Sequence, residues 1–287
     1  MQQRARVVHV ILTRFNCRFV DKDFPARTQP GWLESRFELF ERYCLPTMKA
    51  QTDQNFEWAV FFDAQTPDPF IRRARELFKD HPNFHIRFLE VYTGQHLKDD
   101  LKLLLADRCD WLVSTRLDND DGLGATFVEQ VQRQVAAGRR EAINFAKGLL
   151  LGLKGLYVSR QASNAFLSLS EPFDGFETVL YCPHKEMSRF VPIRDVEAPP
   201  LWLQVIHGGN ISNKLRGRRM LRAKLPSGFE SVPELSTPTV KESAMVVYVE
   251  NMTVALVWAA RDFAAQAYRR LRALFRRQSP DLIKPVR

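Results

Sequence analysis

Short apolar segments between residues 7 and 113 alternate with longer segments in which apolar residues recur every three or four positions. The short segments occupy residues 7–12, 56–62, 84–91 and 111–113. Their length and their β-branched and aromatic residues favour buried strands, whereas the three- to four-residue spacing between them favours amphipathic helices. Strands that alternate with helices predict a mostly parallel sheet with right-handed crossovers. This part of the chain therefore predicts an α/β fold.

The pattern becomes less regular after residue 122. We expect a helix through residues 127–135 and strands at residues 142–145, 149–158 and 201–206. A basic run at residues 212–224 then precedes a stretch rich in Pro, Ser, Thr and Glu, which is typical of a linker. We therefore expect an α/β domain at residues 1–224, a linker at residues 225–242, and a basic amphipathic helical segment at residues 243–287.

The strand that begins at Trp111 ends in a cluster of acidic residues. Asp118, Asp120 and Asp121 fall within four positions, with Asn119 between them. Carboxylates this close repel one another and carry a desolvation cost when buried, which a divalent cation with oxygen ligands offsets. The carboxyl end of a strand is also where open α/β sheets bind their ligands. This position favours a Mg²⁺ or Mn²⁺ site that leaves coordination positions for substrate phosphates.

The same acidic segment has a purely structural interpretation. Asp and Asn bond their own backbone and tolerate unusual dihedral angles, so this sequence also suits a turn that caps the following helix. The pattern argues against a calcium-binding EF-hand loop, because later ligands of that loop are missing. Both the metal site and the capped turn stay open at this point.

Composition narrows the class of partner. The chain has 287 residues, of which 45% are hydrophobic and 26% charged, and its formal net charge is +9. A basic chain favours phosphate-bearing small molecules, anionic lipid surfaces or nucleic acid, although no nucleic-acid-binding motif accompanies the charge. The four cysteines are scattered without a Cys-x-x-Cys pair, which favours a reduced, cytoplasmic setting. The amino terminus lacks a signal-peptide pattern.

The chain resembles the nucleotide-sugar glycosyltransferases with the GT-A fold, and more closely the bacterial rhamnosyltransferase family. Four segments carry this resemblance, which covers roughly residues 5 to 220. They are Thr13-Arg14-Phe15-Asn16, Phe61-Phe62-Asp63-Ala64-Gln65-Thr66-Pro67, Thr115-Arg116-Leu117-Asp118-Asn119-Asp120-Asp121, and Trp202-Leu203-Gln204-Val205-Ile206-His207-Gly208-Gly209-Asn210. The resemblance implies transfer of a sugar from a dTDP- or UDP-linked donor to a hydroxyl of a glycan or lipid-linked acceptor.

Five residues acquire roles from this resemblance. Asp118 and Asp120 match the Asp-x-Asp pair that holds Mn²⁺ or Mg²⁺ on the donor diphosphate, and Asp118 also contacts the donor. His207 matches a later metal or diphosphate ligand. Asp63 matches a position that contacts the base or ribose, and Arg14 lines the nucleotide pocket. From the residues alone, Arg14 is equally a phosphate ligand or a solvated loop residue, and His207 is either a ligand or a strand-end histidine that bonds a carbonyl.

Charge builds on the leaving diphosphate as the glycosidic bond breaks, so fixed cations assist the reaction. Arg116, beside the acidic segment, is placed to assist, as is the basic run at residues 214–219, although such a run is more often a solvated surface.

An inverting transferase also needs a general base. We expect it at Asp174 or Glu171, in the loop after the strands of the second half, with Glu177, His184 and Glu186 as further candidates. The Glu-Asp pair of many processive relatives is absent, which argues against a processive enzyme.

Two other interpretations compete with the transferase. Residues 263–277 interleave basic and apolar side chains, a pattern that suits the surface of an anionic membrane. The protein would then bind a membrane or another polyanion, either without catalysis or as a peripheral enzyme at the inner membrane. The other alternative is a metal-dependent nucleotidyltransferase or phosphohydrolase. The first loop, at residues 13–16, is not the glycine-rich phosphate loop that a nucleotidyltransferase is expected to carry.

Overall fold

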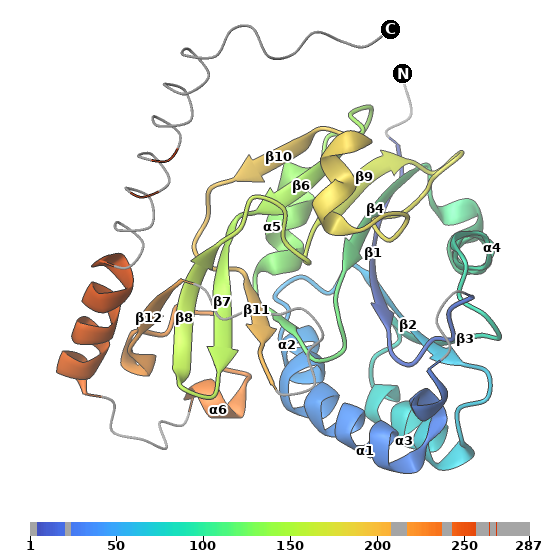
Figure 1. Ribbon diagram of the computed structural model, residues 1–287. Helices are drawn as coiled ribbons and strands as arrows, with labels where there is room; N and C mark the ends of the chain where they lie inside the picture. Colours follow the sequence, from blue (N-terminus) through green and yellow to red (C-terminus); the bar gives the residue numbers. More distant parts are fainter. Residues whose placement is uncertain are drawn as a thin grey trace, which may run out of the picture. The chain divides into compact units, whose positions relative to one another are not determined.

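The computed structural model describes residues 5–20, 24–207, 217–236 and 243–256, together with the single residues 264 and 268. The chain divides into two compact units, Met1–Thr239 and Val240–Arg287. The first unit contains two sheets and the helices that pack against them (Figure 1).

The larger sheet has seven strands in the order β10-β6-β9-β4-β1-β2-β3. Their bounds are β1 Val7–Arg14, β2 Glu57–Asp63, β3 Phe84–Leu89, β4 Trp111–Arg116, β6 Glu141–Phe145, β9 Ser168–Pro172 and β10 Ile193–Val196. Strands β3, β2, β1 and β4 pair in parallel, and β9 runs antiparallel between β4 and β6. The predicted α/β class, with a mostly parallel sheet flanked by helices, is therefore confirmed.

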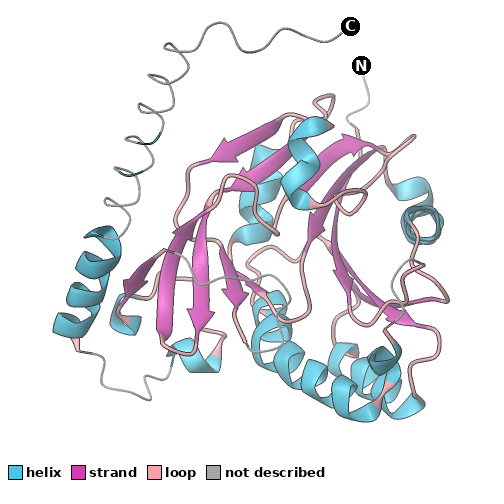
Figure 2. Cartoon of the chain, viewed as in Figure 1, coloured by secondary structure: helices cyan, strands magenta, loops and turns pink. Residues whose placement is uncertain are grey.

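Helices cover both faces of this sheet (Figure 2). Their bounds are α1 Pro30–Leu39, a π-helical turn Phe40–Cys44, α2 Leu45–Lys49, α3 Asp68–Phe78, α4 Gly94–Leu105 and α5 Phe127–Gln134. Because side chains alternate along a strand, each central strand supplies two cores. Ile11 and Val60 pack in the core that contains α1, α3 and α5, whereas Val10 and Ala59 pack in the core that contains α4.

The smaller sheet has five strands in the order β12-β8-β7-β11-β5. Their bounds are β5 Gly122–Leu123, β7 Lys147–Gly152, β8 Gly155–Arg160, β11 Trp202–Val205 and β12 Arg218–Met220. The fully buried ring of Trp202 lies over Gly148 and donates its indole N–H to the Phe145 carbonyl at 2.8 Å. A Cβ at position 148 would lie 1.9 Å from the Trp202 ring, so this close approach requires glycine.

Residues 225–236 differ from the linker expected there. Phe229, Val232 and Leu235 are buried in a core cluster with β7, β8 and β11, and α6 spans Pro233–Ser236. Three apolar residues at three-residue spacing bury one face of this segment, which places it in the first unit. The rest of the expected linker, residues 237–242, lies outside the described residues.

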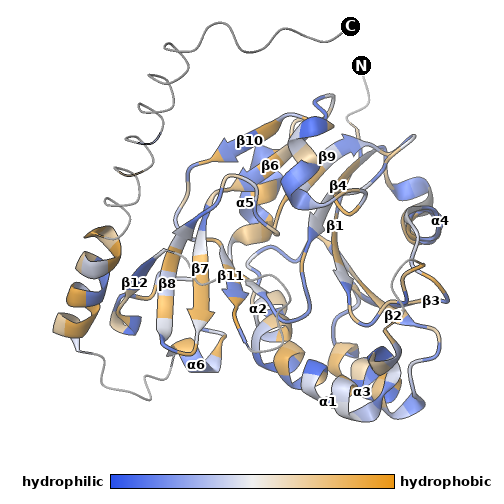
Figure 3. Cartoon of the chain, viewed as in Figure 1, coloured by the Kyte–Doolittle hydropathy of each residue, from blue (hydrophilic) through white to orange (hydrophobic). Residues whose placement is uncertain are grey.

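The second unit is described at residues 243–256, of which 244–256 form a helix. Figure 3 shows that much of this helix is apolar. Its exposed large apolar side chains are Met245, Val246, Tyr248, Val249, Met252, Val254 and Leu256. The segment at residues 263–277, which we expect to contact a membrane, lies outside the described residues apart from 264 and 268. Within the described part of the chain, no helix has the length and apolar character needed to cross a membrane.

Candidate functional site

The acidic segment connects the two sheets. It leaves the larger sheet at the end of β4 and enters the smaller sheet at β5. Between these strands the Asp121 N–H donates to the Asp118 carbonyl at 3.2 Å, and the Asn119 side chain donates to the Phe15 carbonyl at 2.8 Å. Asp121 accepts the N–H of Val205 at 2.8 Å. The segment is therefore fixed at both ends and through its own side chains.

Asp118 lies in a cationic environment. Arg116 donates to both oxygens of Asp118, from Nε at 3.1 Å and from the terminal nitrogen at 2.8 Å. Burial alone would raise the pKa of Asp118, but the positive charges of Arg116, Arg14 and His184 outweigh burial and hold that pKa below its ordinary value. The structure thus brings the predicted site residues Arg14 and Arg116 to Asp118.

Arg14, the last residue of β1, is held by two aromatic rings. Its guanidinium carbon lies 5.4 Å from the ring centroids of both Phe19 and Tyr92. Cation–π contacts of this kind orient an arginine without neutralising its charge. The positive charge of Arg14 therefore stays available beside Asp118.

Asp120 and His207, which the family resemblance assigned to one metal site, meet across the two sheets. The Nε2 atom of His207 lies 2.9 Å from an Asp120 oxygen, and Arg36 of α1 donates to the same oxygen at 3.0 Å. Nothing in the sequence predicted that Arg36 contacts Asp120, because the sequence of an amphipathic helix does not show which distant residue a basic side chain will bind. Burial, followed by the charges of Asp120 and Asp118, holds the pKa of neighbouring Asp121 well above its ordinary value.

The predicted metal ligands fit a divalent ion only as a pair. The His207 Nε2 atom and the Asp120 oxygen lie 2.9 Å apart in a direct hydrogen bond, which the two groups would exchange for bonds to the ion. Asp118 instead directs both oxygens to Arg116. No group of three His, Cys, Asp or Glu side chains suited to a metal occurs among the described residues. Asp120 and His207 would therefore hold the ion, and the structure does not bring Asp118 into that pair.

Asp63 does not face the site. Its side chain is 1% exposed and pairs with Arg27, whose Nε donates to Asp63 at 2.7 Å. The other Asp63 oxygen accepts the N–H of Gln65 at 2.7 Å. The base or ribose contact expected for Asp63 would require this buried ion pair to open. The structure assigns Asp63 to holding the segment that carries Arg27.

Glu171 and Asp174, our expected general bases, lie at the other edge of the larger sheet. Glu171 pairs in register with Leu112, six residues before Asp118, and roughly 3.3 Å per residue places the two carboxylates about 20 Å apart along the sheet. This separation removes the geometric basis for either residue as the base.

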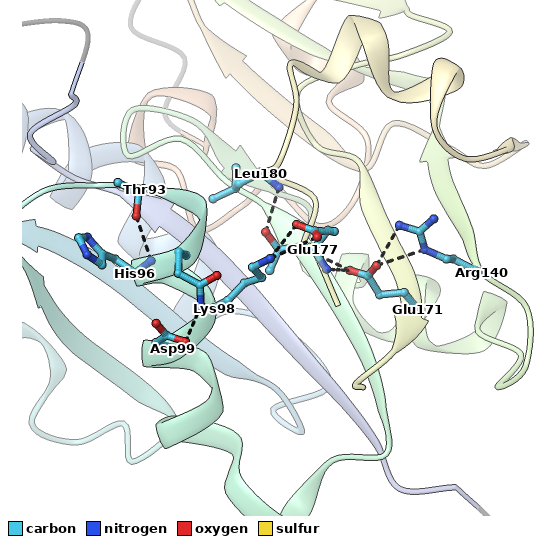
Figure 4. Close-up of polar contacts among 10 residues, drawn as sticks. Thr93, His96, Lys98, Asp99, Arg140, Glu171, Glu177 and Leu180 are labelled. Carbon is cyan, nitrogen blue, oxygen red and sulfur yellow. Dashed lines mark hydrogen bonds and ion pairs between the residues drawn. The ribbon is translucent and has the colours of Figure 1, made fainter. Parts of the chain in front are cut away.

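The buried Glu171 carboxylate also has structural partners. It accepts the N–H groups of Glu177 and Thr178 and pairs with Arg140 (Figure 4). Glu177 in turn pairs with Lys98 of α4. Burial, the largest cause, raises the pKa of Glu171 despite these partners. Asp174 lines a cavity of about 550 Å³ with Lys98 and Lys102, at this same edge.

Of the basic run at residues 214–219, the described part begins at Gly217. Arg218 and Arg219 lie in β12, an edge strand of the smaller sheet. The assisting role that we expect for this run stays a prediction.

Comparison with known families identifies one match. The sequence profile of the family described as "Putative rhamnosyl transferase" matches residues 18–219. No curated protein matches the chain in sequence.

Several solved structures are similar to the chain at low identity. S. aureus TarS is 12% identical with a TM-score of 0.41, and the match covers 70% of this chain and 37% of TarS. TarS 1–349 in complex with UDP-GlcNAc is 11% identical with a TM-score of 0.43, and the match covers 71% of this chain and 60% of that one. A putative nucleotide-diphospho-sugar transferase from Desulfovibrio desulfuricans G20 is 10% identical with a TM-score of 0.36, at coverages of 70% and 82%. The match thus covers 37% of the longer TarS chain and 60% of the TarS 1–349 chain, less than two thirds of either.

Proposed function

The chain belongs to the family described as putative rhamnosyl transferases, and from that premise we propose that it transfers a sugar from a nucleoside diphosphate donor to an acceptor hydroxyl. One observation supports this proposal above the others. The acidic segment at residues 118–121 is fixed between two sheets, and Arg14, Arg116 and Arg36 surround it. A fixed set of arginines and carboxylates suits a ligand that carries both phosphates and a metal ion.

The donor diphosphate would lie against the cations of this site. Arg14 and Arg116 supply charge where the leaving diphosphate becomes more negative, which stabilises the transition state. A Mn²⁺ or Mg²⁺ ion held by Asp120 and His207 would supply further stabilisation of that charge. The carboxylate of Asp118 orients Arg116 by accepting two of its N–H groups, and the remaining N–H groups of Arg116 can donate to the diphosphate. Together these side chains would fix the diphosphate and leave the sugar at the site's edge.

The finer parts of the proposal concern the sugar and the course of the reaction. The family description supports rhamnose as the transferred sugar. We propose dTDP or UDP as the nucleotide. One of the similar TarS structures contains UDP-GlcNAc, which makes UDP-sugars a second donor class to test. We propose an inverting reaction, in which the acceptor hydroxyl attacks the sugar directly.

We propose a lipid-linked acceptor at the inner membrane, and features of the second unit support this proposal. Seven large apolar side chains are exposed on the helix at residues 244–256. An exposed apolar helix near a basic segment suits the surface of an anionic membrane, where a lipid-linked acceptor would be found. All four cysteines are free thiols, which supports a reducing, cytoplasmic setting. Co-sedimentation with phosphatidylglycerol vesicles tests membrane binding, and equal recovery with and without vesicles would refute it.

Ligand-dependent thermal stability tests the donor proposal. A ligand that binds only the native state raises the melting temperature by mass action. We expect UDP or dTDP to raise the melting temperature, and Mn²⁺ to increase that shift. Asp120→Asn should lose the Mn²⁺-dependent part, since it removes one charge from the Asp120–His207 pair. Asp99→Asn, on the exposed side of α4, is the matched control.

The outcomes separate the parts of the proposal. A folded protein that no nucleotide stabilises would refute the transferase. A nucleotide shift that is equal in Mn²⁺ and in EDTA would refute the metal and leave the arginines as the diphosphate ligands. An equal loss in Asp99→Asn would show that the effect of Asp120→Asn is not specific to the site.

A further inference from the structure

His184 reaches the acidic segment by a return path along the larger sheet. After β9 ends at Pro172, the Thr178 N–H bonds Glu171, at the far edge of the sheet. The Val179 N–H then donates to the Ser114 hydroxyl, midway along β4, at 2.8 Å. His184 follows at the start of a 3₁₀ helix, His184–Arg189. The path therefore runs in the direction of β4, toward Asp118.

Electrostatics agrees with the direction that these hydrogen bonds give. The charges of Arg116 and Asp118 both affect the pKa of His184, and the charge of His184 in turn affects that of Asp118. Such mutual effects require the groups to lie near one another. His184 therefore lies beside the proposed diphosphate site, unlike Glu171 and Asp174.

The path is rigid. Thr178 is fully buried and has a φ of 71°, a conformation that costs a β-branched residue energy and persists only where the surroundings enforce it. Phe176, Val179 and Met187 are buried in the core that contains α4. His184 is thus held between two buried anchors, Val179 before it and Met187 after it.

The imidazole ring of His184 is oriented by Ser163. Its Nδ1 atom lies 2.8 Å from the Ser163 carbonyl oxygen, and the Ser163 hydroxyl donates to the His184 carbonyl. A carbonyl oxygen can only accept, so Nδ1 must carry the proton. The neutral ring then has its lone pair on Nε2, and Nε2 makes no hydrogen bond to any described residue. This leaves Nε2 open as a proton acceptor.

We infer that His184 is the general base of the transfer reaction, an inference that rests on the proposed function. The Nε2 lone pair takes the proton of the acceptor hydroxyl while the acceptor oxygen forms its bond to the sugar C1 atom. The bond between C1 and the diphosphate oxygen breaks, and its electron pair leaves with the nucleoside diphosphate. The imidazolium afterwards releases its proton to water. Attack opposite the leaving group inverts the anomeric centre.

The local chemistry favours His184 over the neighbouring acids. Burial, the largest cause, lowers the pKa of His184, so the ring is neutral and able to accept a proton at pH 7. Glu186, on the same turn, pairs with Arg189 at 3.3 Å. Asp118 is occupied by Arg116. His184 was among the sequence candidates, but sequence alone did not rank it first.

The test compares His184→Ala with Glu186→Gln as the matched control. The assay is release of UDP or dTDP from UDP-GlcNAc and dTDP-rhamnose, with water as the acceptor. We expect kcat of His184→Ala to fall by about 100-fold or more, the contribution typical of a general base. The Kd for UDP or dTDP should stay within about twofold of the wild-type value, and added imidazole should restore part of the rate. Glu186→Gln should retain the wild-type rate.

A second measurement does not depend on turnover. Nitrogen-15 NMR of the histidine rings, with the His184 signal identified by its absence in His184→Gln, should show a neutral ring protonated at Nδ1. A ring protonated at Nε2 would overturn the inference, as would a kcat within threefold of wild type in His184→Ala. A rate loss matched by weaker nucleotide binding would make His184 a donor ligand and also overturn it. Failure of the wild-type protein to bind any nucleotide would instead refute the proposed function itself.

Discussion

The buried ion pair between Asp63 and Arg27 joins the end of β2 to the segment between β1 and α1. Its contribution to stability can be tested directly. The side chains are 1% and 9% exposed, and they lie 2.7 Å apart. Asp63→Ala would remove the Asp63 carboxylate from the buried Arg27 charge, which keeps its other partners, among them the Phe24 carbonyl at 3.0 Å. It would also remove the acceptor of the Gln65 N–H. The change therefore leaves one charge and one backbone donor without their present partner.

The expected cost follows from these two losses. Removing one partner of a buried ion pair costs about 3–5 kcal/mol, and the lost acceptor adds about 1 kcal/mol. Asp63→Ala should therefore lower the free energy of unfolding by at least about 3 kcal/mol, or roughly 150-fold in the folded-to-unfolded ratio. The double variant Asp63→Leu with Arg27→Met removes both charges and should recover most of that loss.

Urea unfolding of the wild type, Asp63→Ala, Asp63→Leu, Arg27→Met and the double variant measures this loss and the coupling between the two side chains. A loss below about 1 kcal/mol in Asp63→Ala would refute the structural role given to the pair. If that small loss came with much weaker UDP or dTDP binding, Asp63 would be a nucleotide ligand, as the family resemblance implied. Stability and nucleotide affinity therefore separate the two roles of Asp63.

Two further predictions concern the core. Gly148→Ala places a methyl group 1.9 Å from the Trp202 ring and should cost about 1–3 kcal/mol or more, measured by thermal unfolding. Gly31→Ala, with nothing within 4 Å, is its control, and equal melting temperatures for the two variants would contradict the clash. The second prediction concerns His9, whose pKa burial lowers to about 3. Below pH 6.5 His9 therefore binds a proton in the unfolded chain but stays neutral in the native state. The free energy of unfolding should therefore fall by about 3 kcal/mol between pH 6.5 and pH 4 because of His9. Urea unfolding of His9→Gln should show a pH dependence that is smaller by this amount.

The sequence predicted most of what is local in this fold. Apolar strands and amphipathic helices alternate as their periodicity indicated, because each element buries one face or both against its neighbours. Asp120 and His207 were assigned to one site by the family resemblance, and each follows the end of a strand. Their meeting at 2.9 Å follows from that placement, although their strands belong to different sheets.

The sequence did not predict where Glu171 and Asp63 lie, and both cases have one physical cause. Strand direction and long-range pairing leave no local signal in the sequence. Residues 168–172, Ser-Leu-Ser-Glu-Pro, alternate too weakly to predict a strand, and nothing shows that this strand runs antiparallel to β4. That direction carries Glu171 away from Asp118. Likewise, Arg27 reaches Asp63 from a 3₁₀ helix, Pro25–Thr28, that lies 36 residues earlier, and no spacing rule would join them.

The attachment of the acidic segment to both sheets also has a consequence for the order of assembly during synthesis. One end continues from β4, which pairs with β1 and can form early on the ribosome. The other end is β5, which pairs with β11, about 80 residues later. In a nascent chain that has not yet emerged past Val205, Thr47 can already accept the Leu123 N–H, but β5 lacks β11 and Asp121 lacks the Val205 N–H. The site therefore becomes complete late in translation, when nearly all of the first unit is already available to fold around it.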